Sequence, residues 1–184
     1  MRATDQPAQS SSELSARIGL RLRELRTARG LSLSELARHS GVGKATLSGL
    51  ESGSRNPTLE TLYALTTALG LPLSTALQEP ERGARFSGQV LDAVLLDRSE
   101  DAAAVSETYR IRIRPGGVRR SAAHPPGTVE HLVVLSGTAL VGAAASPVTV
   151  TAGGHHTWAA DLPHCYEAVA QDVEAVLVVR YPHG

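Results

Sequence analysis

The sequence is poor in cysteine, in lysine and in long apolar runs. The scarcity of cysteine and the lack of long apolar runs each exclude a class of protein. Cys165 is the only cysteine, so no disulfide can form within the chain, and a reducing compartment is expected. No stretch is long and apolar enough to cross a membrane, and the N-terminal MRATDQPAQSSSE lacks the apolar core of a signal peptide. We therefore expect a soluble, cytoplasmic protein with no membrane partner.

The whole chain of 184 residues also lacks net charge, since its formal net charge is zero. The distribution is uneven, however. Residues 14–78 contain eight basic and four acidic side chains, a net charge of +4, which leaves −4 for the remainder. Lys44, the only lysine, lies in this basic half. Such an asymmetry indicates nucleic acid or another acidic partner for the first half.

The first half has the apolar period of helices. From Leu14 onward, apolar residues recur at steps of three and four, which is typical of an amphipathic helix. The stretch Ser32-Leu33-Ser34-Glu35 has a capping-box pattern for the start of a second helix. Further helical stretches, closed by glycines, are predicted at about 32–39, 43–52 and 58–69, with a weak one near 74–78. Residues 14–78 are thus predicted to be a compact helical bundle, and residues 1–13 a disordered tail.

The period changes after residues 79–87, which contain proline, glycine and charges without periodicity and are predicted to be a linker. Residues 109–114 alternate strictly, with Tyr109 on the face expected in the core. Further β-rich runs lie at 129–135, 147–151 and 173–181. Residues 88–182 are therefore predicted to be an all-β sandwich or barrel, which makes the chain an α+β protein of two domains.

Two predicted helices joined by a glycine turn, SLSELARHS-GVG-KATLSGLESG, have the helix-turn-helix arrangement, whose second helix enters the DNA major groove. Small residues make the leading face of that helix lean enough for the groove. Lys44 at its N-terminus can reach guanine or a phosphate, Ala45 a thymine methyl, and Ser48 either base type. The side chains suited to phosphate oxygens are those of Ser32, Thr46, Arg55 and Asn56. Small residues can also mean close helix packing, and a lone lysine is usually a solvated surface residue.

The run LSLSELARHSGVGKATLSGLESGSRNPTLETLYALTTALGLPL resembles the Xre/lambda-repressor-like helix-turn-helix family, across about residues 14–78. The resemblance implies binding of double-stranded operator DNA and regulation of transcription. It also implies that Arg26 of the first helix pairs with Glu51 near the end of the recognition helix and helps to bind the DNA backbone. A polar side chain often stands where this chain has Gly49, so base reading there is expected to be missing or indirect.

Residues 88–182 resemble the cupin family, a small jelly-roll type β-barrel with two sequence motifs. Glu130, followed seven residues later by Gly137, matches the end of the first motif, and Gly153 or Gly154 with Pro163-His164 matches the second. Strand alternation places Glu130 and His131 on opposite faces, so only one of them can face the interior.

Metal-binding cupins supply two histidines and a glutamate from the first motif and one histidine from the second. The resemblance implies that His124, Glu130 and His164 hold three of these positions, whereas Pro126 or Ala122 stands in place of the companion histidine. The three remaining groups form a facial triad suited to iron, manganese or zinc. The missing ligand favours the alternative, a metal-free pocket in which the histidines hydrogen-bond an organic ligand.

Several other residues have two interpretations. Tyr109, Trp158 and Tyr166 are candidates for lining the pocket, although an aromatic residue in a small barrel more often packs in the core. Cys165 is expected to point away from the interior, which leaves a redox-sensor role as a weak hypothesis. Arg110, Arg112 and Arg114 are expected on a solvated face of their strand, although they would form an anion pocket if the two faces were reversed. His155 and His156 are expected in a turn at the surface.

The leading hypothesis is a one-component transcriptional regulator, not an enzyme, whose cupin domain binds a small-molecule effector. Helix-turn-helix half-sites are read about 34 Å apart, so a homodimer is expected, with the cupin barrel as the dimer surface. The alternative is a metal-dependent oxygenase or isomerase fused to a DNA-binding domain, which requires a metal and turnover. A protein-binding module of the antitoxin type is disfavoured by the pocket motifs.

Overall fold

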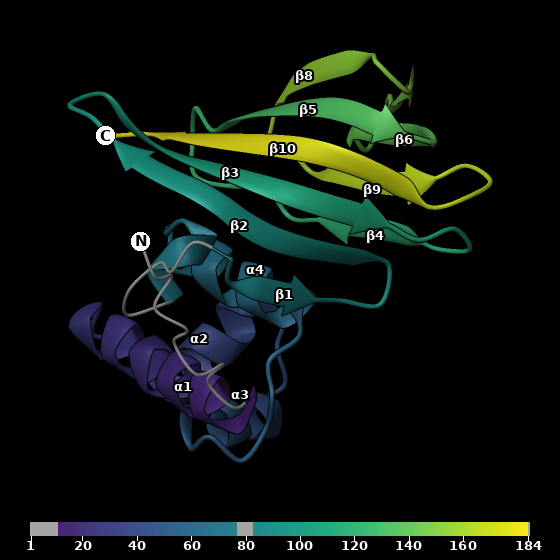
Figure 1. The fold of residues 1–184 in the computed structure, drawn as a ribbon. Helices are drawn as coiled ribbons and strands as arrows, with labels where there is room; N and C mark the ends of the chain where they lie inside the picture. The colour runs from purple at the N-terminus through teal and green to yellow at the C-terminus, as the bar shows by residue number, and fades with distance from the viewer. Residues whose placement is uncertain (1–10, 77–82, 184) are drawn as a thin grey trace, which may run out of the picture.

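The computed structural model describes residues 11–76 and 83–183, and its helices precede its strands (Figure 1). The helices are α1 (Ser11–Ala28), α2 (Leu33–Ser40), α3 (Lys44–Glu51), α4 (Leu59–Ala68) and the short 3-10 helix η1 (Leu73–Ala76). The strands are β1 (Arg85–Ser87), β2 (Leu91–Glu100), β3 (Ala104–Ile113), β4 (Val118–Ser121), β5 (Val129–Ser136), β6 (Thr138–Ala143), β7 (Val148–Thr151), β8 (His155–Ala159), β9 (His164–Ala168) and β10 (Val173–Pro182). None of the described helices is long and apolar enough to span a membrane.

The helical bundle is held by a leucine core and by a close approach of α1 to α3. Leu22, Leu36 and Leu47 are fully buried at its centre. The predicted capping box is present, since the Ser32 hydroxyl accepts from the Glu35 amide and the Glu35 carboxylate accepts from the Ser32 amide. A Cβ on Gly19 of α1 would lie 2.0 Å from the Leu50 carbonyl oxygen of α3. Only glycine therefore allows α1 and the predicted recognition helix to pack this closely.

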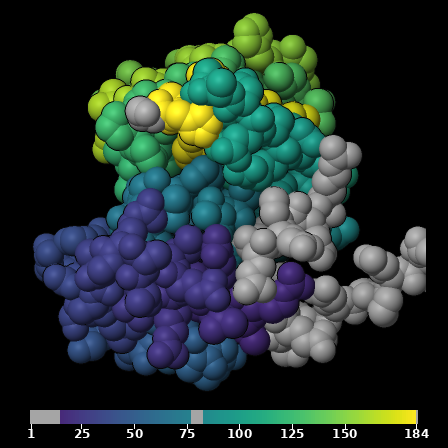
Figure 2. All heavy atoms as spheres, turned by 90° about the vertical axis from the view of Figure 1, so that its left-hand side faces the viewer, coloured from purple at the N-terminus to yellow at the C-terminus, as the bar shows by residue number. Residues whose placement is uncertain are grey.

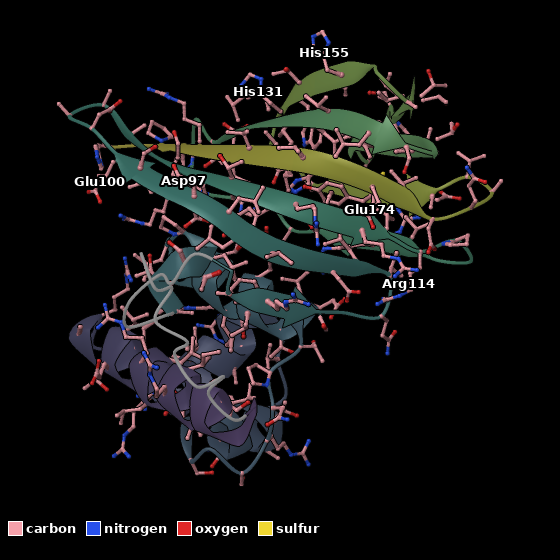
Figure 3. All side chains as sticks on the ribbon, viewed as in Figure 1. Asp97, Glu100, Arg114, His131, His155 and Glu174 are labelled. Carbon is pink, nitrogen blue, oxygen red and sulfur yellow. The ribbon has the colours of Figure 1, made fainter. Side chains whose placement is uncertain are left out.

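The strands form two antiparallel sheets that face each other. One sheet has the order β1-β2-β3-β10-β5-β8 and the other the order β4-β9-β6-β7. The core lies between them, which is the sandwich predicted from the short β-rich runs. Glu130 and His131 lie on opposite faces of β5, as predicted, with Glu130 inside and His131 outside. Figure 3 shows His131 and His155 projecting from the outer side of the sheets, away from the helices.

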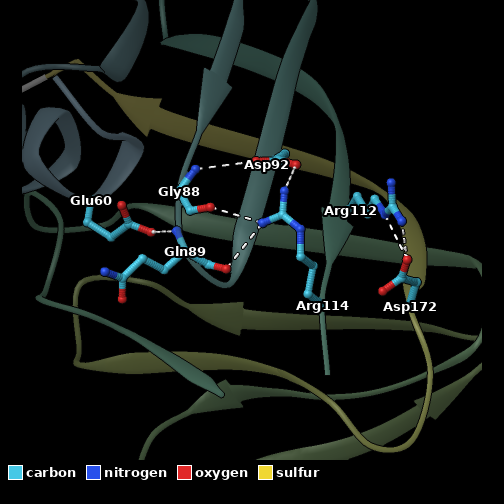
Figure 4. A network of polar contacts seen from close by, with 7 residues as sticks. All are labelled: Glu60, Gly88, Gln89, Asp92, Arg112, Arg114 and Asp172. Atoms are coloured by element: carbon cyan, nitrogen blue, oxygen red, sulfur yellow. Dashed lines mark hydrogen bonds and ion pairs between the residues drawn. The ribbon is translucent and has the colours of Figure 1, made fainter. Parts of the chain in front are cut away.

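The arginines of β3 lie on the outer face. Tyr109, Ile111 and Ile113 are buried, whereas Arg110 and Arg112 are exposed, so the predicted assignment of faces is confirmed. Arg112 pairs with Asp172 and Arg114 pairs with Asp92, as Figure 4 shows. The reversed arrangement, in which these arginines would face the interior of the sandwich, is not found.

The helical part packs directly on the strands. Helix α4 contacts β2 and β4, and the buried apolar core runs without interruption from the helices into the sandwich. Figure 2 shows the same contact from the side, with the purple and blue helices against the teal strands. Buried Glu107 of β3 joins the two parts, since it accepts hydrogen bonds from the Ser74 amide of η1 at 3.0 Å and from the Tyr109 hydroxyl.

The structure differs from the sequence prediction at several boundaries. Helix α1 begins at Ser11, inside the segment predicted as a disordered tail, and residues 1–10 lie outside the described residues. Strand β1 takes up the end of the predicted linker, because Phe86 has a buried place beside β2, while residues 77–82 lie outside the described residues. His155 and His156 begin β8 instead of forming a turn, and pairing with β5 accounts for this.

Substitution of Gly19 tests the approach of α1 to α3. The Gly19→Ala variant should lose about 1–3 kcal/mol of unfolding free energy, because the new methyl group meets a backbone carbonyl that can move only with its helix. The matched control is Gly49→Ala in α3, where the nearest obstacle is the flexible Arg55 side chain at 2.9 Å. Denaturant unfolding should show the loss at residue 19 only, and equal effects in the two variants would contradict the packing described here.

The buried carboxyl group of Glu107 should make stability depend on pH. Burial raises the pKa of Glu107 above the ordinary 4.5, although hydrogen bonds from Ser74 and Tyr109 act in the opposite direction. Its contribution to stability is therefore largest below pH 4.5 and falls as the pH rises through the folded-state pKa. The Glu107→Gln variant lacks this linkage, so its unfolding free energy relative to wild type should increase from acidic to neutral pH.

Thermal unfolding of wild type and of Glu107→Gln from acidic to neutral pH measures the difference in their unfolding free energy. Glu174→Gln, on β10, controls for the change of charge at a position outside the core. A difference between Glu107→Gln and wild type that stays constant with pH would show that Glu107 titrates alike in the folded and unfolded chains.

Candidate functional site

The N-terminal part of α3 has an exposed face on which most side chains are small. Gly41, with φ of 69°, ends α2, and two further residues lead to Lys44 at the start of α3. Lys44, Ala45 and Ser48 are exposed, while Leu47 and Leu50 on the opposite side are buried and fix the orientation of the helix. The three side chains predicted to reach base edges therefore lie together on the accessible side of α3.

Arg26 and Glu51 form the pair that the family resemblance implies. Arg26 Nε lies 2.7 Å from Glu51 Oε1, Arg26 Nη2 lies 2.7 Å from Glu51 Oε2, and Arg26 Nη1 donates to the Leu31 carbonyl at 2.8 Å. Hydrogen bonding to Glu51 raises the pKa of Arg26, so the guanidinium stays charged. This bidentate pair joins α1 to the end of α3 and uses most donors of Arg26. Contact of Arg26 with the DNA backbone remains a prediction.

The predicted phosphate-binding side chains lie around α3. Ser32, Arg55 and Asn56 are exposed, and Thr46 is half-buried. A Cβ at Gly49 would lie 2.9 Å from Arg55 Cδ, so the Arg55 side chain occupies the space beside this glycine. The absence of a side chain at residue 49 therefore leaves room for the flexible Arg55 side chain along the helix, which the family pattern did not indicate.

In the sandwich, the structure brings His124, Glu130 and His164 together. His124 comes from the loop before β5, Glu130 from β5 and His164 from β9, and all three are buried. His124 Nε2 lies 3.2 Å and His164 Nε2 lies 3.6 Å from Glu130 Oε1. One ligand atom from each residue falls within 4.8 Å of the others. The predicted triad is thus assembled with a geometry that could hold a metal ion.

The hydrogen bonds of His164 show how well the triad fits a cation. His164 Nδ1 lies 2.9 Å from the Leu162 carbonyl oxygen, which can only accept, so the proton is on Nδ1. His164 Nε2 is buried without a hydrogen-bond partner among the described residues and faces the Glu130 carboxylate. A lone pair directed at a carboxylate requires a proton or a metal ion between them. Carbonyl-bound Nδ1–H is also the usual support of a histidine that ligates a metal through Nε2.

Glu130 is an anion in this buried site. Burial alone would raise its pKa, but the hydrogen bond to His124 and the electrostatic interactions with His164 and His124 together bring the pKa below the ordinary value. The Tyr166 hydroxyl donates to the other carboxylate oxygen. An ionised carboxylate and two imidazoles are the donor set that suits iron, manganese or zinc.

The aromatic candidates divide between the pocket and the core. Trp158 and Tyr166 are buried with ring centroids 6.4 and 5.8 Å from that of His164, and their role in binding a ligand stays a prediction. The Tyr109 hydroxyl donates to Glu107, which also binds the backbone of η1, and this position agrees with the second interpretation of Tyr109, as a residue of the core. His156 is half-buried and stacks on Trp158 with centroids 5.6 Å apart, so it is more than a surface residue.

Cys165 follows His164 on β9 and is buried. Burial raises the pKa of the Cys165 thiol above its ordinary value, with Glu167 acting in the same direction. The thiol is therefore protonated at neutral pH and poorly accessible to oxidants, which argues against the redox-sensor hypothesis.

The sequence did not indicate that the helical bundle borders this pocket. Thr67 Oγ1 of α4 lies 3.5 Å from His124 Nδ1, and the rings of Tyr63 from α4 and Tyr181 from β10 lie 5.8 Å from the His124 ring. A cavity of about 200 Å³ lies at this junction, with lining residues from α4 and from the segment 119–124. Tyr63 and Thr67 have no local motif, because their role depends on tertiary contacts between the bundle and the sandwich.

Comparisons with known proteins agree with both halves of the structure. The helix-turn-helix family matches residues 22–75. The HTH-type transcriptional regulator SutR of Escherichia coli (strain K12) is 30% identical over 167 residues, which cover 89% of this chain and 94% of SutR.

Two solved structures are also similar. An HTH_3 family transcriptional regulator from Vibrio cholerae is 26% identical with a TM-score of 0.83 and covers 95% of this chain and 100% of that chain. The Cupin_2 domain of an XRE family transcriptional regulator from Enterobacter cloacae is 24% identical with a TM-score of 0.47 and covers 52% of this chain and 100% of that chain. The chain belongs to the family of HTH-type transcriptional regulators, with a helix-turn-helix region followed by an antiparallel β-sandwich.

Proposed function

We propose that this regulator binds an operator as a homodimer and that a small-molecule effector in the cupin domain alters its operator affinity. We assign DNA binding to residues 14–78 and sensing to residues 88–182. The observation that carries the proposal is the contact between His124 of the triad and Thr67 of α4 at 3.5 Å. Because α4 belongs to the helical bundle, a change at the triad acts on an element of the DNA-binding domain without an intermediary.

We assign operator contacts to the exposed face of α3 and its surroundings. Lys44, Ala45 and Ser48 read base edges, and Arg55, Asn56, Ser32 and Thr46 bind phosphates. The rigid Arg26–Glu51 pair holds α3 in the orientation that this contact needs. Two copies are required because helix-turn-helix half-sites lie about 34 Å apart, farther than one bundle can reach.

The triad residues His124, Glu130 and His164 would hold a divalent ion of iron, manganese or zinc. Support comes from the unpartnered Nε2 of buried His164 and from the ionised Glu130 beside it. Such an ion would supply a Lewis-acidic centre with open positions for an effector. The regulator needs no turnover. The alternative, a metal-dependent cupin oxygenase or isomerase fused to a DNA-binding domain, would use the same three residues and is distinguished by turnover.

Replacing Lys44 tests the DNA interface. Lys44→Ala should weaken operator binding and relax the preference at one position of the site by about 1–3 kcal/mol, because a guanine contact is lost. Arg110→Ala, which removes an exposed positive charge from β3, is the matched control and should change neither property. Fluorescence anisotropy with an operator obtained by library selection measures both. Unchanged affinity and preference in Lys44→Ala would show that this lysine is only a solvated surface residue.

Metal content tests the triad. Untagged protein purified without chelator should contain close to one iron, manganese or zinc ion per chain by elemental analysis. The His164→Ala variant should lose the ion because its Nε2 ligand is gone, whereas His131→Ala, on the outer face of β5, should retain it. Metal-free wild-type protein would contradict the metal assignment and indicate an organic ligand. Metal retained in His164→Ala would place the ion elsewhere.

A further inference from the structure

Arg119 is a buried cation with unused donors. It lies on β4 between exposed neighbours, and its side chain is only 4% exposed because it points inward, toward α4. Its guanidinium carbon lies 4.8 Å from the centroid of the Tyr63 ring, and Nη1 lies 3.6 Å from Glu60 Oε1. The second distance is too long for a hydrogen bond. Within the part of the chain that the structure describes, Glu60 is the only charge partner of this guanidinium, and the Arg119 nitrogens are not among the fully enclosed atoms that lack a partner, so they are open to the adjoining cavity.

The unused donors adjoin the cavity between α4 and the sandwich. It has a volume of about 200 Å³, below the range of about 300–1,000 Å³ that is typical for drug-sized ligands, so it suits a small metabolite. Helix α4 contributes carboxylate, aromatic, methyl and hydroxyl groups, and the sandwich contributes two guanidinium groups, a hydroxyl, a methyl and an imidazole. The lining residues are Glu60, Tyr63, Ala64, Thr67, Arg119, Arg120, Ser121, Ala122 and His124.

We propose that this cavity binds a small monocarboxylate, which deepens the proposed function and rests on it. The carboxylate accepts hydrogen bonds from Arg119, for which a two-oxygen acceptor is the best geometric match. The apolar body lies against Tyr63 and Ala64. A single negative charge fits better than a phosphate dianion, because Glu60 lines the same cavity and Glu130 lies behind His124.

Glu60 explains how occupancy would reach the DNA-binding domain. It lies in the first turn of α4, and its Oε1 accepts from the Gln89 amide at 3.1 Å, as Figure 4 shows. Its charge balances Arg119 without satisfying the guanidinium donors. A bound carboxylate competes with Glu60 for Arg119 and so weakens the attraction between α4 and β4. The ligand thereby changes the free energy of the arrangement in which the bundle is held on the sandwich.

A comparison of the binding of three carboxylates and of their neutral amides separates recognition of the charge from recognition of the shape. The purified full chain is titrated with acetate, butyrate and benzoate, and with acetamide, butyramide and benzamide, while thermal unfolding is followed. At least one carboxylate should raise the unfolding temperature with a saturable concentration dependence, and its amide should not. The Arg119→Gln variant should bind that carboxylate about ten- to a hundredfold more weakly, because charge-assisted hydrogen bonds are lost.

Further variants identify the site even where Arg119→Gln folds poorly. Arg119→Lys keeps the charge but loses the paired donors, so its affinity should lie between those of wild type and Arg119→Gln. Glu60→Gln removes the competing charge and should strengthen carboxylate binding. Arg110→Gln, at an exposed arginine of β3, should leave binding unchanged. Equal effects of acids and amides, no stabilisation by any of the three acids, or a preference for acids that survives Arg119→Gln would overturn the proposal.

Operator affinity measured on the same samples separates this inference from the proposed function. The carboxylate that binds should shift operator affinity in wild type and lose this effect in Arg119→Gln. Operator binding without carboxylate binding would reject the cavity site and leave the regulator proposal intact. Absence of any sequence-preferring DNA binding would reject the proposed function, whatever the carboxylates do.

Discussion

The packing of α4 and η1 on the sandwich is the constraint on which the rest of the structure depends. One continuous apolar core passes through this contact, so the bundle and the sandwich bury surface on each other and are not joined by the linker alone. A polar group that is buried in the contact costs free energy unless it finds a partner, and some of these partners lie across the contact. Glu107 meets this requirement by binding the Ser74 amide, and His124 by facing Thr67. The helices that orient α3 and the residues of the pocket therefore share a single interface.

His124 links the two sides of that interface through its two ring nitrogens. Nε2 faces Glu130 at 3.2 Å, and Nδ1 faces the hydroxyl of Thr67 at 3.5 Å. If Nε2 carries the proton, it donates to Glu130 and Nδ1 accepts from Thr67. If Nε2 gives its lone pair to a metal ion, the proton moves to Nδ1 and is donated to Thr67. A hydroxyl can both donate and accept, so Thr67 is suited to either protonation state of His124. The direction of the hydrogen bond between Thr67 and His124 depends on which nitrogen carries the proton.

Most of the helical bundle follows from local signals, and much of the sandwich does not. Glycines and a capping box mark the ends of short helices, so α2, α3 and α4 fall within one or two residues of their predicted places. Strands such as β4 and β9 depend on partners distant in sequence, and their short segments have no strict alternation. His124, Glu130 and His164 were found through the cupin motifs, but Tyr63, Thr67 and Arg119 were not. Their role exists only because α4 packs on β4, and no local pattern encodes that contact.

Ion pairs are satisfied to different degrees inside the bundle and between the bundle and the sandwich. The Arg26–Glu51 pair inside the bundle is bidentate with distances of 2.7 Å, and such a pair has one well-defined arrangement. Arg119 and Glu60, which join the two domains, are 3.6 Å apart and leave donors unused. A satisfied pair would fix the domains in one arrangement, because any change would leave a buried charge uncompensated. An incompletely satisfied pair loses less free energy when the arrangement changes. The loosely paired groups therefore lie between the bundle and the sandwich, and the tightly paired groups lie inside the bundle, where α1 is joined to α3.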